Sequence, residues 1–375
     1  MNIGVPFEVD CFIALGWLIV KILAVAGDAG GARALEPVVR RLRSTPGMEV
    51  ECRAFAAASE IWEKAGFRPV PCNFLEVRGF NRIILGGTVG SEQYELEVIR
   101  QARTLKIRTV SVLDFWSHYR ERFTTHEGAF VLPDAIAVMD AQACQDMIAL
   151  GFPRECLHVT GHPVFDELAR YDGSEAKNQA GLRLRQLVGR PSDERCILYA
   201  SQPLSQLFSR EALGFLEDEV LQDIIASLGR VLDRQSKRAS LLVKLHPREM
   251  GKPYPLPPSP SPNLSVVLVG RDGIEPREMA VGSDLVIGMN SMLLMEACLL
   301  KRPVVSYQPG LRIEDPLPSN RMNWSRGVYS RQELDGALEK ELFDLKTRQD
   351  RECLLSEIPP TNGATERVIA LLLSY

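Results

Sequence analysis

Short apolar runs rich in valine and isoleucine alternate along most of this chain with longer segments in which apolar residues recur at helical spacing. An uninterrupted apolar run is typical of a strand that is buried on both faces of a parallel sheet, and the helical segments are long enough to form the crossovers. The alternation begins at residue 20, stops near Gly161 and restarts at residue 195. The pattern therefore predicts an α/β fold with two tandem Rossmann-like, doubly wound domains.

The predicted elements follow from the same pattern. In the first half we expect strands at 20–26, 49–55, 82–86, 107–113, 135–139 and 156–159, with helices at 31–44, 57–65, 90–105 and 141–149. In the second half we expect strands at 195–201, 239–245, 264–269, 284–287 and 303–307, with helices at 211–235, 276–281 and 290–300. Two further helical patterns follow, at 331–351 and 363–374.

The domain boundaries are placed where this alternation is interrupted. A length of 375 residues suits two domains. We expect a lead-in segment at 1–19, a first domain at 20–170, a linker at 171–194, a second domain at 195–350, and a C-terminal helix within 351–375 that packs back toward the first domain. Ligands bind at the carboxyl ends of parallel strands, so we expect the functional residues to line a cleft across which the two domains face each other.

Composition narrows the class of protein. Hydrophobic residues make up 45% of the chain and charged residues 25%, as in globular proteins, and the formal net charge of -4 disfavours a nucleic-acid partner. The eight cysteines are scattered singly without metal-ligand spacing, so we expect no disulfide framework, no metal site and a cytoplasmic location. The lead-in is apolar but carries Glu8 and Asp10, which argues against a signal peptide. Contact of the lead-in with the inner membrane surface or with another subunit stays open.

Two groups of candidate residues lie at strand ends in the first domain. The first strand ends in Gly27-Asp28-Ala29-Gly30-Gly31, where Gly30 and Gly31 let the backbone approach a ligand and Asp28 can act as a general base. The glycine spacing is not that of a nicotinamide fingerprint, and a plain strand-to-helix turn is the alternative. The segment 114–122 brings Asp114 and His118 together with two arginines, which could equally be solvated.

The remaining candidates lie at later strand ends. His162 precedes a rigid proline at the expected domain junction, where it either meets the ligand or caps a hinge. Lys244 and His246 project to one face at the end of a strand and can converge on a phosphate, together with Arg248. The segment after residue 288 offers Asn290 or Ser291 as a helix cap whose exposed amides can bind a diphosphate.

A carboxylate stands inside the apolar helix that begins there. Glu296 is costly in that position unless it is hydrogen-bonded or paired. The vicinal hydroxyls of a ribose are suitable donors for it. A structural arginine or lysine is the alternative partner.

These features together resemble the GT-B glycosyltransferase superfamily, which also contains the UDP-N-acetylglucosamine 2-epimerases. The resemblance rests on the two tandem units, the glycine-rich first turn, the segment Val159-Thr160-Gly161-His162-Pro163-Val164-Phe165-Asp166 and the segment 283–308, and it spans residues 20 to 370. It implies that the second domain binds a nucleotide-sugar donor, that Asn290, Ser291 and Met292 meet the diphosphate, and that Glu296 meets the ribose. The Lys244-Leu245-His246-Pro247 step also looks like the His-Pro element of bacterial sialyltransferases and CDP-glycerol glycerophosphotransferases.

The resemblance implies a metal-independent, inverting glycosyltransferase of bacterial surface polysaccharide or glycolipid synthesis. Its donor would be UDP-linked or CDP/CMP-linked, without a further cofactor, and its acceptor a glycan or glycolipid. Asp28 would be the base, with His118 as competitor, while Lys244 and His246 stabilise the leaving phosphate. The chain lacks the Gly-Thr-Arg-Pro-Glu and His-x-Glu-Ala-Gly elements of the epimerases, so a 2-epimerase is the second alternative and a non-catalytic nucleotide-sugar binder the third. The oligomeric state stays open.

Overall fold

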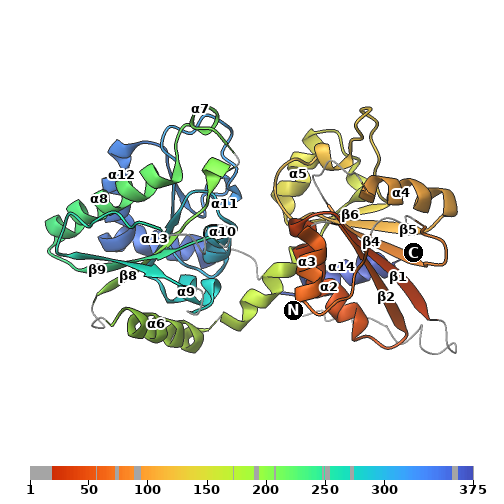
Figure 1. Ribbon diagram of the computed structural model, residues 1–375, viewed down its shortest axis with the longest axis horizontal. Coiled ribbons are helices and arrows are strands. Elements are labelled where there is room, and N and C mark those ends of the chain that lie inside the picture. The colour runs from red at the N-terminus through yellow and green to blue at the C-terminus, as the bar shows by residue number, and fades with distance from the viewer. Residues whose placement is uncertain are drawn as a thin grey trace. The chain divides into compact units, whose positions relative to one another are not determined.

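The computed structural model describes residues 19–55, 57–71, 76–87, 94–171, 173–189, 194–206, 208–246, 249, 254–270, 274–356 and 362–374. The lead-in up to residue 18, Pro247 and Arg248 lie outside the described residues. The chain forms two compact units (Figure 1). Unit 1 comprises Met1–Asp166 with Thr361–Tyr375, and unit 2 comprises Glu167–Pro360.

Unit 1 is built on a seven-stranded sheet of order β3-β2-β1-β4-β5-β6-β7, in which all neighbouring strands are parallel. Its strands are β1 (Val20–Ala26), β2 (Met48–Ala54), β3 (Val70–Pro71), β4 (Arg82–Gly86), β5 (Arg108–Val112), β6 (Ala135–Val138) and β7 (Leu157–Val159). The order reverses direction between β1 and β4. Ligands of doubly wound sheets bind at the carboxyl ends of the strands at this reversal.

Helices cover both faces of the unit 1 sheet. α2 (Ala29–Arg43), α3 (Ala57–Lys64) and α14 (Ala364–Leu373) lie on one face, while α4 (Tyr94–Leu105) and α5 (Ala141–Ala149) lie on the other (Figure 1). Although α14 comes last in the chain, Val368 and Leu372 are fully buried against α2 and the strands. Asp166 holds its start, since the amides of Ala364 and Thr365 donate to the two carboxylate oxygens at 2.9 and 2.7 Å.

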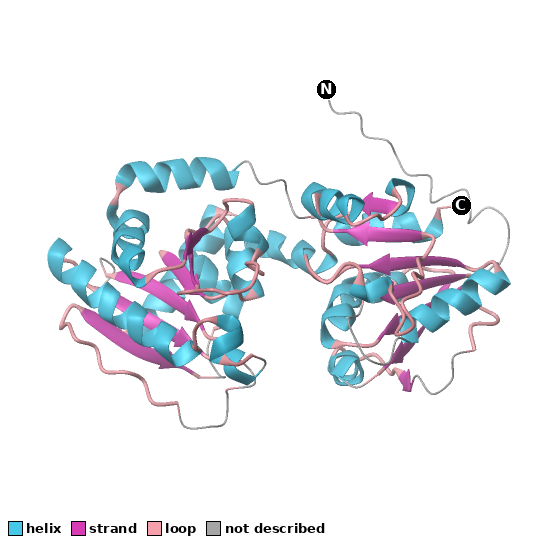
Figure 2. Ribbon diagram, turned by 90° about the horizontal axis from the view of Figure 1, so that it is seen from above, coloured by secondary structure: helices cyan, strands magenta, loops and turns pink. Residues whose placement is uncertain are grey.

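Unit 2 repeats the architecture with a six-stranded parallel sheet of order β10-β9-β8-β11-β12-β13. Its strands are β8 (Arg195–Ala200), β9 (Ala239–Lys244), β10 (Leu264–Val269), β11 (Leu285–Gly288), β12 (Val304–Tyr307) and β13 (Arg326–Val328). Here the order reverses between β8 and β11. Figure 2 shows the strands of each unit between helices, and the predicted fold class is confirmed.

Two of the predicted helices of unit 2 are each divided into two shorter helices in the structure. They are α6 (Ser174–Val188), α7 (Arg210–Leu213), α8 (Glu217–Gln235), α9 (Pro276–Gly282), α10 (Met292–Leu299), α11 (Pro318–Arg321), α12 (Arg331–Phe343) and α13 (Leu345–Ser356). The predicted single helix at 211–235 is wrong, because Gly214 adopts a φ of 103° and ends α7. The predicted helix at 331–351 is also two helices, because Asp344 is extended and accepts the Thr347 amide at 2.9 Å.

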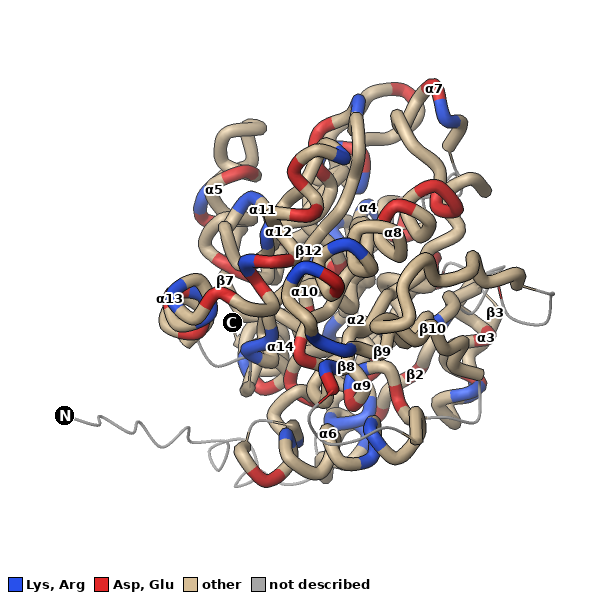
Figure 3. Tube along the Cα trace, turned by 90° about the vertical axis from the view of Figure 1, so that its left-hand side faces the viewer, with Lys and Arg blue, Asp and Glu red and all other residues tan. Residues whose placement is uncertain are grey.

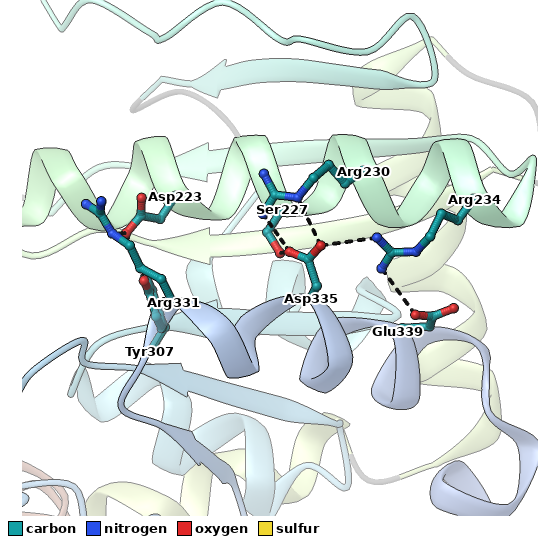
Figure 4. A network of polar contacts seen from close by, with 8 residues as sticks. All are labelled: Asp223, Ser227, Arg230, Arg234, Tyr307, Arg331, Asp335 and Glu339. Atoms are coloured by element: carbon teal, nitrogen blue, oxygen red, sulfur yellow. Dashed lines mark hydrogen bonds and ion pairs between the residues drawn. The ribbon is translucent and has the colours of Figure 1, made fainter.

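The outer helices of unit 2 are joined by charged side chains. Asp335 on α12 accepts hydrogen bonds from Ser227, Arg230 and Arg234 on α8 (Figure 4). Acidic and basic residues are interspersed along the trace elsewhere too (Figure 3). Among the described residues, no helix has the length and apolar composition needed to cross a membrane.

Candidate functional site

The carboxyl ends of four unit 2 strands line up at the reversal of strand order. In the strand register Lys244 pairs with Ala200, Ala200 with Gly288, and Gly288 with Ser306. Because neighbouring strands are about 4.8 Å apart, the end of β9 and the turn after β11 lie roughly 10 Å from each other. The sheet therefore brings the Lys244–His246 segment and the start of α10 to one edge.

The turn between β11 and α10 is held by side chains and presents two backbone donors. The Asn290 amide donates to Gln202 Oε1 at 3.0 Å, which ties the turn to the end of β8. Ser291 is the N-cap of α10, and its Oγ accepts the Leu293 amide at 3.3 Å. Within the described part of the chain, the amides of Ser291 and Met292 donate to no acceptor. A half-buried helix start with such amides can bind an anion.

Glu296 follows Met292 by four residues in α10, so the two lie on the same face of the helix. Its side chain is 11% exposed and forms an ion pair with Arg277 on α9. Both Arg277 Nε (3.1 Å) and Nη2 (2.8 Å) donate to Glu296 Oε1. The alternative of a structural arginine partner is thus present in the structure. Burial raises the pKa of Glu296, and the hydrogen bond from Arg277 opposes that rise.

Arg277 also contacts a second carboxylate. Its Nη1 donates to Glu167 Oε2 at 2.6 Å, and Glu167 belongs to the 3-10 helix η3 (Pro163–Tyr171). Burial disfavours the guanidinium charge, but the hydrogen bonds and attraction to Glu296 and Glu167 outweigh burial and raise the pKa of Arg277. Arg277 is therefore a permanent cation shared between a buried and a half-exposed acid.

Lys244 and His246 are both partly buried at the end of β9. Lys244 Nζ donates to the Leu245 carbonyl at 3.0 Å, and the His246 amide donates to Glu249 Oε2 at 2.8 Å. Glu249 also accepts the Ser201 hydroxyl at 2.9 Å, and burial raises its pKa. Glu249 thus holds the backbone that carries the predicted phosphate-binding histidine.

A buried chain of hydrogen bonds supports the β11–α10 turn from the side of β12. Ser306 Oγ donates to the Met289 carbonyl at 2.6 Å, and Gln308 Nε2 donates to Ser306 Oγ at 3.1 Å and to Asp315 Oδ1 at 2.9 Å. Ser306 and Gln308 are fully buried. These hydrogen bonds fix the turn, because moving Met289 would leave buried polar groups unsatisfied.

The corresponding edge of unit 1 carries the other predicted residues. The Gly31 amide donates to Asp28 Oδ1 at 2.8 Å, so Asp28 is the N-cap of α2. A methyl group at Gly30 would lie 1.7 Å from Asp114 Oδ2, and one at Gly31 would lie 3.1 Å from the Cα of Gly86. The two glycines therefore make room for a carboxylate and for the end of β4. Two carboxylates gather at the positive end of α2, where the helix dipole stabilises them.

Asp114 is held in place by Arg122 rather than by solvent. Arg122 Nη1 donates to Asp114 Oδ1 at 2.5 Å, and the arginine side chain is 4% exposed. Arg120, in contrast, is exposed and lies over the ring of Phe130. The possibility that Arg122 is solvated is therefore wrong. Arg120 is exposed to solvent, as that alternative predicted.

The two histidines of unit 1 differ in environment. His162 is 5% exposed, and its Nδ1 accepts the Val164 amide at 3.3 Å. Its Nε2 must then carry the proton that is donated to the Asp114 carbonyl at 3.0 Å. His118 is exposed, has a φ of 54° and contacts the Ser117 hydroxyl at 2.8 Å. The structure brings His162, but not His118, into the cluster around Asp114.

Sequence reasoning missed Gln202, Glu249 and Arg277 at the unit 2 edge. Gln202 could have been found, because it stands two residues after a strand that flanks the reversal of strand order. Glu249 and Arg277 are recognisable only from their partners. Among the described residues there is no group of three or more His, Cys, Asp or Glu side chains placed to hold a metal ion.

Comparisons with known proteins identify the fold. No family model and no curated protein sequence matches the chain. The UDP-GlcNAc 2-epimerase from Neisseria meningitidis bound to UDP-GlcNAc is similar in structure, with a TM-score of 0.62 at 13% identity, over 94% of this chain and 100% of that chain. The glycotransferase of kitacinnamycin has a TM-score of 0.60 at 12% identity, over 94% and 98% of the chains. Anabaena HepE in complex with UDP and glucose has a TM-score of 0.58 at 14% identity, over 95% and 100%. The chain therefore has a GT-B fold.

Proposed function

We propose that this protein is an inverting glycosyltransferase that takes a nucleotide-activated sugar as donor and binds it in unit 2. The observation that carries the proposal is the start of α10, where the amides of Ser291 and Met292 donate to no acceptor among the described residues and Glu296 follows on the Met292 face of the same helix. Four residues of helix rise about 6 Å. The amides suit a diphosphate, and the carboxylate suits the hydroxyls of its ribose.

Further groups at the same edge support charge stabilisation on the leaving phosphate. Lys244 ends β9 in the same register row as Gly288, which precedes the β11–α10 turn, and His246 follows two residues later. A lysine ammonium, an imidazole and backbone amides together supply the positive field that a departing nucleoside diphosphate requires. The reaction as proposed needs no metal ion or cofactor beyond the nucleotide sugar.

The base of the reaction is proposed in unit 1. Asp28 stands at the carboxyl end of β1, and as the base it takes the proton of the acceptor hydroxyl as that hydroxyl attacks the anomeric carbon of the donor. His118 is the competing base, and its exposed imidazole supports that role. The acceptor is proposed to be a glycan or glycolipid of bacterial surface polysaccharide synthesis at the cytoplasmic side of the membrane.

Thermal unfolding with UDP, CDP, CMP and GDP tests donor binding. The nucleotide of the true donor should raise the Tm by mass action, by the equivalent of about 2.7 kcal/mol at a hundredfold excess over its Kd. The variant Met292→Pro removes one of the two amides and leaves the Ser291 cap in place, because Met292 is the first residue of α10 and a helix tolerates proline there. We expect this variant to lose most of the shift, and no shift with any of the four nucleotides would contradict the proposal.

A 2-epimerase is the second candidate, because several of the similar structures are UDP-GlcNAc 2-epimerases by name. Incubation with UDP-N-acetylglucosamine separates the two, since an epimerase releases or forms the N-acetylmannosamine epimer without an acceptor. A transferase leaves the sugar configuration at C2 unchanged. If donor binding persists while Asp28→Ala and His118→Ala both leave turnover unchanged, the proposed catalytic roles are wrong. Binding without any turnover would identify a non-catalytic nucleotide-sugar binder.

A further inference from the structure

Arg277 is the residue that satisfies Glu296, and both lie within unit 2. α10 is apolar around Glu296, with Met295 and Ala297 on either side, both at most 1% exposed. A carboxylate in such surroundings is unstable as an anion without a cation beside it. Arg277 is that cation, since two of its N–H groups converge on Glu296 Oε1.

The way in which Arg277 binds leaves its partner usable. Both hydrogen bonds end on Oε1, and neither involves Oε2 of Glu296. Two donors on one oxygen anchor Oε1 and neutralise the charge of the carboxylate. Oε2 keeps its capacity to accept hydrogen bonds, on a residue that shares a face of α10 with Met292.

We propose that Arg277 is the positioning residue for recognition of the donor's pentose, because it holds Glu296 in the orientation that accepts the vicinal hydroxyls. This inference rests on the proposed function. Arg277 itself touches Glu296 and Glu167 and acts on the nucleotide only through Glu296. Specificity for a ribose thus depends on a residue outside the α10 sequence segment.

Glu167 has a separate task in this arrangement. It takes the Nη1 edge of the guanidinium at 2.6 Å, whereas Glu296 takes the Nε and Nη2 edge. Glu167 is half-exposed, with 52% of its side chain accessible, whereas 11% of the Glu296 side chain is accessible. A lysine cannot serve both edges, because its ammonium lacks the planar fork of arginine.

The test compares the affinities for UDP and 2′,3′-dideoxy-UDP by calorimetry, in wild type and in Arg277→Met, Arg277→Lys and Arg183→Met. Arg183 on α6 forms an ion pair with Glu278 of α9 at 2.9 Å, and so controls for loss of an arginine that pairs with α9 without touching Glu296. Wild type should prefer UDP by roughly 10- to 100-fold, the worth of a hydrogen bond to a charged group. Arg277→Met should bring the two affinities within about threefold by weakening UDP alone, and Arg183→Met should keep the wild-type ratio.

Arg277→Lys carries the test if Arg277→Met does not fold, and it should lower the ratio by about fivefold or more. A ratio that is unchanged in the folded Arg277 variants, or equal weakening of both ligands, overturns the positioning role and leaves donor binding intact. If wild type does not bind UDP, the comparison is made with whichever of CDP and GDP raises its Tm and with the 2′,3′-dideoxy form of that nucleotide. Absence of binding with all of them overturns the proposed function, and this inference with it. The two failures are therefore distinguishable.

Discussion

Replacing Gly30 with alanine tests the arrangement at the start of α2. The added methyl group would lie 1.7 Å from Asp114 Oδ2 and 2.8 Å from Asp114 Cγ, so the carboxylate must leave its position. In leaving, it gives up the 2.5 Å contact with Arg122, whose side chain is 4% exposed. We therefore expect Gly30→Ala to destabilise unit 1 because it breaks the ion pair between Asp114 and Arg122.

The magnitude follows from the burial of the pair. Breaking a buried ion pair costs about 3–5 kcal/mol. Asp114 keeps 15% of its side chain accessible and can recover part of its solvation after it moves, so we expect about 2–4 kcal/mol. For a unit of this size that corresponds to a fall in Tm of roughly 5–15 °C.

Urea unfolding followed by circular dichroism measures the effect, and a double-mutant cycle with Asp114→Ala isolates its cause. In the Asp114→Ala background the methyl group at position 30 meets little, so Gly30→Ala should cost less than about 0.5 kcal/mol there. Gly336→Ala in α12 is the control, because its methyl group would meet nothing within 4 Å and should stabilise the helix by about 0.5–1 kcal/mol. A Gly30→Ala cost that is equal in both backgrounds would refute the reasoning.

Three further predictions follow from other parts of the structure. The hydrogen bond from Arg230 lowers the pKa of Asp335 to about 2, so its contribution is complete above pH 4 and is lost as the pH falls toward 2. Asp335→Asn should therefore cost about 1–2 kcal/mol at pH 7, allowing for solvent around the arginines, and a difference from wild type that persists undiminished at pH 2 would contradict this. Asp166→Ala removes the cap of α14 and should cost about 1–2 kcal/mol, with earlier proteolysis within 364–373 than in Asp166→Asn; equal proteolysis would count against the cap. Gly214→Ala would bring a methyl group within 2.0 Å of the Gly310 carbonyl at a positive φ and should lower the Tm more than Gly336→Ala raises it; an unchanged Tm would show that the loop adapts.

The predicted strands agree closely with the structure because their signal is local. β1 occupies Val20–Ala26 and β10 occupies Leu264–Val269, where the sequence predicts strands at 20–26 and 264–269. One error lies where a contact distant in sequence decides, and others have local causes. The helix predicted at 211–235 breaks at Gly214 because that residue packs against Gly310, and the two-residue strand β3 is too short to produce a periodic pattern.

The sequence predicted where several residues of the candidate site lie, but not which residues they contact. Asn290 is visible as a residue after a strand, yet its amide is bound by Gln202, 88 positions earlier. Glu296 is conspicuous as a carboxylate among apolar residues, whereas nothing in the sequence distinguishes Arg277 from the chain's other arginines. The same holds for Gly30, where the carboxylate that requires a glycine belongs to Asp114.

The sequence by itself therefore determined the two-unit α/β fold and the strand ends at which polar residues gather, because burial and backbone periodicity are encoded within short segments. The tertiary structure alone decided which residues distant in sequence meet, because strand order and helix packing set those distances. Asp114 above Gly30 and Arg277 beside Glu296 are both consequences of that packing.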